Sequence, residues 1–507
     1  MVKTVVGEET QLKLVEDRVF QSGISAQVGI VIGKISSSID RGFVFDLIPT
    51  PPNDGGQPAC YISESKDDNS NKKKGSAKGK SQTQLDSSSP TSSLVIDSDW
   101  VAEHARQVSR MLLGGMHVVG VYVWASEISF KNSTLKLWQT VKEVAQAAAS
   151  FENGLDERLL IHISYSPRRW TCRNCSVGST MTSNSLRPCD FKMGRVLASL
   201  QTFRCMYNFD IRLPIYRENL SKANTLTNIL HNGISRHAKE LKSAKDIIDG
   251  NLVVQDQPCT SDGLHEVELL LPFMKDASFE ACSQKEVLGV VAYQGSACSY
   301  AYLSPREPIS QAVADIKADI LTSLKSRLAI ISDEGEEDMD STAEAGRDSN
   351  AEISTEKSIS KLDLSLLRKS CILTFPRRVL VPWVGGAFIC DYLQPSETFQ
   401  VLEDNLKELM SMEAPIDVSK IIEAETEATS LKIKSFWDAV ISNPSTSQSA
   451  SPSKKNSQKD STQKEASREP VKSTTFNIVI PIIVLLVAML LGFFLFVRDP
   501  KAHSRVV

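Results

Sequence analysis

A long apolar run near the C-terminus is the feature that most constrains this chain. The segment Ile478–Val497 holds twenty residues and no charge. A helix needs about 20 predominantly apolar residues to cross a bilayer core of roughly 30 Å, whereas a buried helix of a soluble domain normally keeps a polar face. Pro481 lies in the first turn of the segment, where its missing N–H removes no helical hydrogen bond. The run therefore predicts one transmembrane helix rather than a buried core helix.

The opening residues indicate on which side of the membrane the rest of the chain lies. Residues Met1–Phe20 have no continuous apolar stretch and carry acidic side chains early, unlike a secretory signal peptide. Lys and Arg residues flank the apolar run on both sides, so loop charge does not decide the orientation. We therefore expect a tail-anchored, single-pass protein with a cytosolic N-terminus. The endoplasmic reticulum membrane is the first expectation, and the mitochondrial outer membrane the second.

Length, charge and cysteine content set broad limits on the cytosolic body. A chain of 507 residues is expected to hold two to four domains. Its net charge of −4 is not the excess of positive charge that is typical of nucleic-acid-binding proteins, so no nucleic-acid partner is expected. The ten cysteines are irregularly spread, and in the cytosol we expect them to stay reduced.

Three polar segments contain too few apolar residues to offset the entropy of ordering them. They are a Ser- and Lys-rich loop at 62–95, an acidic linker at 332–358 and a flexible stalk at 443–475. The loop holds a basic cluster, which predicts either a solvated surface or contact with an acidic membrane or nucleic acid. That cluster consists of Lys72, Lys73, Lys74, Lys78 and Lys80.

The first folded block, residues 1–170, combines strand and helix patterns. Apolar β-branched runs predict strands at 26–34, 42–48, 117–124 and 159–164. A helix is predicted after the first loop, capped by Ser98 or Asp99 and stopped by Gly114 and Gly115. A second amphipathic helix follows at 135–151. The block is therefore predicted to be of the α/β (α+β) class, with helices packed against a mixed sheet.

Two further blocks are predicted downstream. Residues 187–331 form a second α/β block, with a long helix at 223–248. Residues 361–441 form a C-terminal α/β extension, with one strand over 371–383, another over 387–393, and a helical stretch that runs, with a break near Pro415, to about 441. Arg377 and Arg378 either pair with a partner's carboxylate or form a solvated strand entry, which the pattern favours.

The sequence contains few motifs that are typical of catalytic or metal-binding sites. The chain contains no Walker loop, GxGxxG, GxSxG or HExxH sequence. The best metal candidate is the group Cys172, Cys175 and Cys189, spaced C-x₂-C-x₁₃-C. Because zinc prefers four ligands, Cys205 or His162 would have to supply the fourth. The pattern favours reduced cysteines in a loop over such a zinc site, and a loop position does not favour redox catalysis by the CxxC pair.

The first block resembles the JAMM/MPN metalloprotease fold. Residues Gly29 to Gly33, GIVIG, match the G-x-[LIV]-x-G strand of that family, and Gly120 to Ser126, GVYVWAS, align with its G-W-Y-H-x-H-P segment.

This resemblance places Ala26 at the position of the catalytic Glu, Val123 and Ala125 at the two His ligands, and Lys136 at the Asp ligand. These residues supply neither a zinc ligand set nor an acid/base. The resemblance therefore implies a pseudo-enzyme, with no catalytic residue, metal or cofactor, that pairs with another such domain.

Over nearly its full length, the chain resembles the odorant-response-abnormal family of membrane-anchored trafficking factors. The segments that carry this resemblance are QSGISAQVGIVIGK, DRGFVFDLIPTPP, DWVAEHARQVSRMLLGGMHVVGVY, PRRVLVPW, GAFICDYL and the C-terminal span. The resemblance implies a non-enzymatic adaptor of the endoplasmic reticulum that assists trafficking of membrane proteins such as G-protein-coupled receptors. It also implies a second option, docking of a ubiquitin-fold-modifier protease through MPN-like domains. A membrane-surface hydrolase is the alternative of another class.

Overall fold

The computed structural model describes residues 2–36, 40–64, 92–148, 157–178, 185–216, 226–253, 263–272, 287–344, 371–412, 416–425 and 428–435. They all belong to the compact unit Met1–Pro444. The second unit, Ser445–Val507, lies outside the described residues, together with the predicted anchor Ile478–Val497. Among the helices that the structure does describe, none is both long and apolar enough to cross a membrane.

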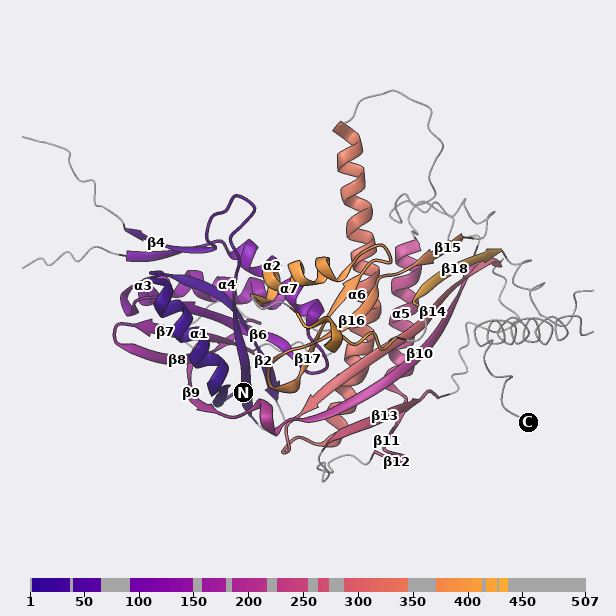
Figure 1. Cartoon of the computed structure of the whole chain (residues 1–507), viewed down its shortest axis with the longest axis horizontal. Helices are drawn as coiled ribbons and strands as arrows, with labels where there is room; N and C mark the ends of the chain where they lie inside the picture. The colour runs from indigo at the N-terminus through magenta and orange to yellow at the C-terminus, as the bar shows by residue number, and fades with distance from the viewer. Residues whose placement is uncertain are drawn as a thin grey trace, which may run out of the picture. The chain divides into compact units, whose positions relative to one another are not determined.

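Seven strands of the N-terminal part close into a barrel (Figure 1). Their order is β1-β3-β2-β6-β7-β8-β9, and the barrel closes because β1 pairs in parallel with β9. Two more strands, β4 and β5, pair as a separate antiparallel hairpin. The bounds are β1 (Thr4–Glu8), β2 (Gln27–Ser36), β3 (Arg41–Pro49), β4 (Cys60–Glu64), β5 (Ser92–Ile96), β6 (His117–Trp124), β7 (Glu157–Tyr165), β8 (Arg168–Ser176) and β9 (Leu186–Gly194).

The barrel corrects three expectations drawn from the sequence. The CRNC segment is not a loop, because it lies in β8 and pairs with β7. The strand β9 ends at Gly194, so block boundaries at 170 and 187 both fall inside the barrel. The predicted loop 62–95 is too long at both ends, which belong to β4 and β5. Its basic cluster lies outside the described residues.

Four helices accompany the barrel, α1 (Glu9–Ser22), α2 (Ser98–Met111), α3 (Glu127–Asn132) and α4 (Thr134–Ala147). The sequence analysis did not predict α1, whose buried side chains are Leu12, Val15 and Val19. The helix α2 forms as expected, but its N-cap is Asp97, one residue before the predicted caps. The Asp97 carboxylate accepts a hydrogen bond of 3.1 Å from the Trp100 amide, which satisfies an N–H that the helix itself cannot pair.

The second sheet has seven strands in the order β12-β11-β13-β10-β14-β18-β15. Its centre is the long antiparallel pair β10 and β14. Two helices, α5 (Leu226–Lys242) and α6 (Ile309–Glu344), cover one face and share a core with it. The strand bounds are β10 (Gln201–Tyr216), β11 (Lys245–Ile248), β12 (Asn251–Leu252), β13 (Leu264–Leu270), β14 (Val287–Leu303), β15 (Cys371–Thr374) and β18 (Ser430–Ser435).

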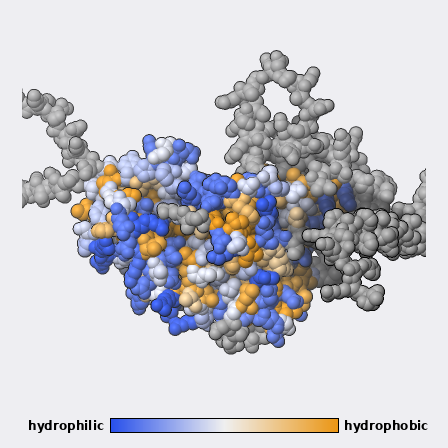
Figure 2. Space-filling view, viewed as in Figure 1, coloured by the Kyte–Doolittle hydropathy of each residue, from blue (hydrophilic) through white to orange (hydrophobic). Residues whose placement is uncertain are grey.

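Both hydrophobic and hydrophilic side chains are exposed on the surface of the described chain. Figure 2 shows hydrophobic residues interspersed with hydrophilic ones on the visible face. On β13, Leu264 and Leu270 are each 51% exposed, and they alternate along the strand with the buried His265 and Val267. One side of this strand therefore contacts the core, and the other faces outward.

The region 361–441 is not a separate extension. The strands β15 and β18 belong to the second sheet. Between them, β16 (Arg377–Pro382) and β17 (Phe388–Leu393) form a hairpin, followed by α7 (Phe399–Met410). The single strand predicted over 371–383 is therefore two strands in two sheets, and the helical stretch predicted to reach 441 ends at Met410.

Two predicted helix ends also change. The helix α6 runs through Glu344, so the acidic linker predicted from 332 begins as helix. Glu is a good helix former, which outweighs the low apolar content of this segment. The predicted helix 223–248 ends as α5 at Lys242, and Lys245–Ile248 is the strand β11.

A shared hydrophobic core joins the barrel to the rest of the described chain. It packs Val101 and Ala105 of α2 with Val379 and Ile389 of the β16–β17 hairpin and with Tyr300 of β14. The two halves are therefore mixed α/β structures that share this core, in addition to one core inside the barrel part and one inside the second sheet, so the three predicted blocks are not independent domains.

Candidate functional site

The positions where the resemblance places the catalytic Glu and the two His ligands lie in the hydrophobic core. Ala26 is 5% exposed, and Val123 and Ala125 are fully buried. All three belong to the core that also contains α2 and α4, and Val123 pairs with Val28 across β2 and β6. Lys136 is half-buried on α4. Apolar side chains thus fill the space where the resemblance places the ligands.

His162, the candidate fourth zinc ligand, is held by other contacts. Its Nε2 atom lies 3.0 Å from the carbonyl oxygen of Ala125, and its ring stacks on Phe130 at a centroid distance of 4.1 Å. Burial lowers the pKa of His162, which favours the neutral ring. The sequence did not predict this role, which joins β7 to the end of β6.

The three candidate cysteines do not converge on one point. Cys172 and Cys189 lie opposite each other on β8 and β9. Cys175 is three residues from Cys172 on the same strand, so its side chain points to the opposite face, and the two thiols lie in different cores. Cys205 belongs to the second sheet. In the described ranges, no three His, Cys, Asp or Glu side chains form a group that could hold a metal ion.

Arg378 corrects both interpretations of the arginine pair. It is 2% exposed, and its guanidinium donates two hydrogen bonds, of 2.8 and 2.9 Å, to the two carboxylate oxygens of Asp319 on α6. Its partner carboxylate therefore lies in the same chain and away from solvent. Arg377, next to it, lies 3.3 Å from the half-exposed Glu423.

A second buried ion cluster joins the barrel to α6. The Lys34 ammonium of β2 lies 2.8 Å from Asp315 and 3.2 Å from Glu307. Burial alone would lower the pKa of Lys34, but the two carboxylates outweigh it and the pKa is raised. A third buried pair joins Arg327 of α6 to Glu425. Removing one partner of such a buried pair would leave the other charge uncompensated in the interior, which strongly destabilises a fold.

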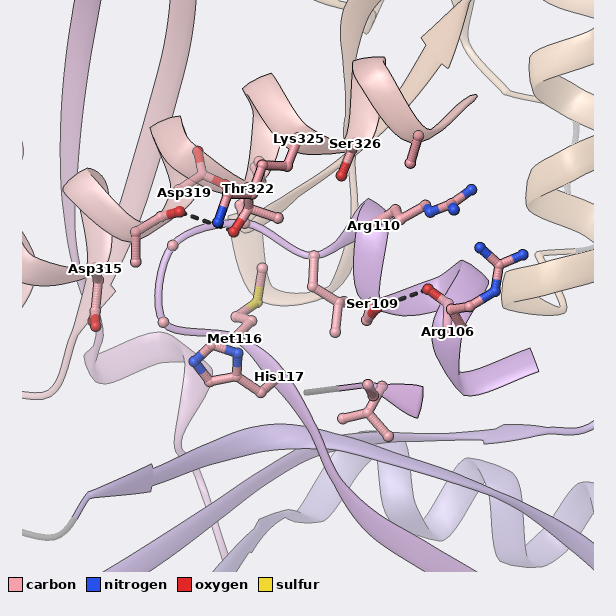
Figure 3. Close-up of a pocket in the computed structure, with 18 of the residues that line it drawn as sticks. Arg106, Ser109, Arg110, Met116, His117, Asp315, Asp319, Thr322, Lys325 and Ser326 are labelled. Carbon is pink, nitrogen blue, oxygen red and sulfur yellow. Dashed lines mark hydrogen bonds between the residues drawn. The ribbon is translucent and has the colours of Figure 1, made fainter. Parts of the chain in front are cut away.

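A cleft of about 410 Å³ lies beside these ion pairs (Figure 3). Its walls are the C-terminal half of α2, the connection to β6, the end of α4 and the middle of α6, with His231 from α5. Both apolar and charged residues line the cleft. The apolar ones are Leu112, Leu113, Met116, Val118, Ala147, Ala148, Ala314, Ala318 and Ala329, and the charged ones are Arg106, Arg110, Asp315, Asp319 and Lys325.

Two glycines let the connection between α2 and β6 approach α6 and β14 closely. A Cβ atom on Gly114 would lie 2.0 Å from the carbonyl oxygen of Tyr300, and one on Gly115 would lie 2.4 Å from Asp315 Oδ2. Gly115 also has a φ of +84°, which favours glycine. The helix α2 ends at Met111, before the Gly-Gly sequence that was predicted to stop it, and the two glycines instead line the cleft.

Electrostatics differ between the interior and the rim of the cleft. In the interior, Asp315 and Asp319 already pair with Lys34 and Arg378. At the rim, Lys325 is half-buried on α6, and burial lowers its pKa to about 8. The cleft could not be predicted from the sequence, because its residues come from four helices, a connection and the strand β6, which are distant along the chain.

Comparison with known proteins decides the family. Residues 29–421 match the ODR4-like family, described as Odorant response abnormal 4-like. The chain belongs to this family. The protein odr-4 homolog of Mus musculus is 25% identical over 350 residues, which cover 65% of this chain and 71% of that protein. The odr-4 homolog of Dictyostelium discoideum is 25% identical over 400 residues, which cover 77% and 76%. The family resemblance predicted from the sequence is thus confirmed.

Among solved structures, the chain is similar to the crystal structure of UfSP from C. elegans. The sequence identity is 8% and the TM-score 0.36, with coverage of 82% of this chain and 58% of that one. A likeness at this level supports no inference about fold or function.

Proposed function

We propose that this member of the ODR4-like family is a non-enzymatic, membrane-anchored adaptor. It would hold membrane proteins, such as G-protein-coupled receptors, during their trafficking from the endoplasmic reticulum. In this proposal the body is a cytosolic platform with an MPN-like barrel that has lost its metal ligands, and Ile478–Val497 is the anchor.

The observation that carries the proposal is that apolar side chains occupy the positions of the catalytic Glu and of the two His ligands. Ala26, Val123 and Ala125 are buried among apolar side chains. A hydrolytic metal site needs several N, O or S ligands and an open position for water. A packed core offers neither, so binding is a better supported role for the barrel than hydrolysis. Family membership supports the trafficking part of the proposal, through what the sequence resemblance implies.

Metal content of the purified full chain tests the non-enzymatic part. The proposal expects no stoichiometric zinc, measured by plasma mass spectrometry, whether the chain is natural or carries Cys172→Ser and Cys189→Ser. One zinc per chain that is lost on Val123→Asp and kept in the cysteine variant would contradict it, because the metal would then lie at the pseudo-ligand positions.

Membrane fractionation tests the anchor. Deleting Ile478–Val497 is expected to release the protein to the soluble fraction, because the segment's apolar surface drives insertion. Replacing the segment with twenty leucines is the matched control and should restore pelleting. Val487→Arg should weaken insertion, since a central charge costs about 2.5–3.5 kcal/mol. If the deleted chain still pellets with membranes, the body binds them by another route.

A further inference from the structure

Two cysteine thiols meet across the strands β8 and β9 of the barrel. Cys172 and Cys189 are direct partners in the antiparallel register, and their side chains form a hydrogen bond with each other. Residues directly opposite on antiparallel strands have Cα atoms about 4.5–5.5 Å apart, within the roughly 4.4–6.8 Å that disulfides span. The backbone therefore holds the two sulfur atoms close to bonding geometry. The adaptor function assigns this pair no role.

Other contacts on the same face fix the register of the pair. Side chains two residues apart on a strand point the same way, so Trp170 and Phe191 form the next pair along this face. Their rings stack with centroids 5.6 Å apart, and the Trp170 indole donates a hydrogen bond of 3.0 Å to Glu16 of α1. A slip of β9 along β8 would break this stack, so Cys172 and Cys189 stay opposite each other.

The two thiols differ in exposure and in their tendency to ionise. Cys172 is 3% exposed in the barrel core, whereas Cys189 is half-buried. The hydrogen bond from Cys172, and a further one from the Asn174 amide, lower the pKa of Cys189, while the same contact between the thiols and burial raise the pKa of Cys172. The Cys189 thiol also donates a weak hydrogen bond of 3.8 Å to the Arg187 carbonyl, which it gives up on ionising. Cys189 is thus the thiol that reaches solvent and ionises first, and the thiolate is the nucleophilic form of cysteine.

We infer that Cys172 and Cys189 form a reversible disulfide when the chain meets a peroxide. The Cys189 thiolate attacks one oxygen of hydrogen peroxide and displaces hydroxide, which takes up the proton that Cys189 released, and Cys189 becomes a sulfenic acid. The Cys172 sulfur then attacks the Cys189 sulfur, and hydroxide leaves as water with the Cys172 proton. Two thiols and one peroxide thus give one disulfide and two waters, and two electrons pass from sulfur to the peroxide oxygens.

The geometry also accounts for the reversibility of the bond. The Cβ atoms of opposite residues lie about 4.5–5.5 Å apart, so they must approach by about 1 Å to reach disulfide spacing. A bond that keeps part of this strain is more easily reduced than a relaxed one. The sequence predicts a cytosolic body, where disulfides are usually transient and redox-sensing.

The disulfide would fasten the strand that closes the barrel. The strand β9 pairs with β8 on one edge and in parallel with β1 on the other (Figure 1). The register with β8 covers only residues 186–189 of β9, so a covalent link there adds to a short ladder. The inference is independent of the adaptor proposal, and either can fail without the other.

Peptide mapping of the purified full chain in detergent tests the inference. The chain is treated with a chelator, reduced, freed of reductant, exposed to hydrogen peroxide and alkylated before digestion. We expect a pair of peptides linked through Cys172 and Cys189, which forms in the folded chain and is lost on adding dithiothreitol. No such linked pair, or one that forms equally fast in urea, would overturn the inference.

Cys175 offers a matched control, because it lies on the same strand but faces the other core. Cys175→Ala should cross-link at the natural rate. Cys172→Ala should block the link and leave Cys189 as a sulfenic acid that dimedone traps, whereas Cys189→Ala should leave Cys172 a thiol. The half-buried Cys189 position keeps the test valid if the core does not accept Cys172→Ala, as the melting temperature of each variant shows. Dimedone labelling of Cys172 in Cys189→Ala at the natural rate would contradict the assigned order of attack.

Hydrogen exchange measures whether the bond fastens β9. Peptides from Leu186–Gly194 should exchange at least several-fold more slowly in the oxidised chain than in the reduced one, because a cross-link restricts local opening. The separate hairpin of β4 and β5 is the internal control and should exchange equally in both forms. Equal exchange of β9 in the two forms would show that the disulfide does not hold this strand.

Discussion

Asp46 on β3 is a buried carboxyl group whose protonation affects folding. It is 8% exposed, and the Leu47 amide donates a hydrogen bond of 2.8 Å to it. Burial raises the pKa of Asp46 to about 7. Since the unfolded value is about 3.9, the native state holds this proton more tightly. Stability therefore falls as pH rises from about 4 to about 7 and stays lower above that range.

Replacing this carboxyl should remove the pH dependence. Asp46→Asn keeps the acceptor oxygen but cannot ionise, so its stability advantage over the natural chain should grow by roughly 2–3 kcal/mol between pH 5 and pH 8. Urea unfolding at the two pH values measures the difference. Asp54→Asn, at an exposed position, is the control for removing one charge. An advantage for Asp46→Asn that is the same at both pH values would contradict the assignment.

The neighbouring arginines of β16 offer a matched test of buried and exposed ion pairs. Arg378→Met should destabilise the chain by about 3–5 kcal/mol, because it leaves the Asp319 carboxylate buried without its partner. Arg377→Met should cost about 1 kcal/mol or less, because its pair with Glu423 is half-exposed. Denaturant unfolding of both variants gives the comparison, and similar costs would refute the burial argument.

Residue types alone could not have revealed which charges are buried. Arg377 and Arg378 are identical in sequence terms, yet alternation along β16 turns one inward and the other outward. The partner Asp319 is 59 residues away from Arg378, so no local pattern links them. By contrast, the residue types alone show that Ala26 cannot act as an acid or base and that Val123 and Ala125 cannot bind a metal.

At the scale of elements, the connection between α2 and β6 depends on Gly115. Gly115→Ala adds a Cβ in a left-handed conformation and against Asp315. Gly250→Ala meets a similar φ of +79° but no atom within 4 Å, so it isolates the backbone strain of about 1–2 kcal/mol. We expect Gly115→Ala to destabilise the chain more than Gly250→Ala in urea unfolding. Equal losses would show that the loop does not press against α6.

Helices and strands could be predicted where their apolar residues recur with a clear period. They were missed where polar residues hide that period. The apolar runs of β2 and β6 gave strands that the structure contains. In β18, SLKIKS alternates with period two, but its position after a helical stretch favoured a helix. The strand β8 is rich in Arg and Cys, and its pairing with β7 rather than its composition makes it a strand.

At the scale of the whole described molecule, the barrel and the second sheet pack against each other. The core that joins α2, the β16–β17 hairpin and β14 is apolar, and Lys34 pairs across it with α6. Sequence reasoning separated these parts because it recognises local periodicity and linkers but not long-range contacts. The anchor Ile478–Val497, by contrast, could be predicted without long-range contacts, because its apolar composition and length alone predict a place in a bilayer.

The partner set of the anchored chain tests the adaptor account most directly. A biotin ligase fused to the N-terminus labels neighbours of the natural chain, of a chain that ends before Asn477, and of a chain with twenty leucines in place of Ile478–Val497. The account predicts labelled membrane proteins, or an MPN-like protease, for the two anchored chains, and loss of these partners for the shortened one. An unchanged partner set in the shortened chain would contradict it.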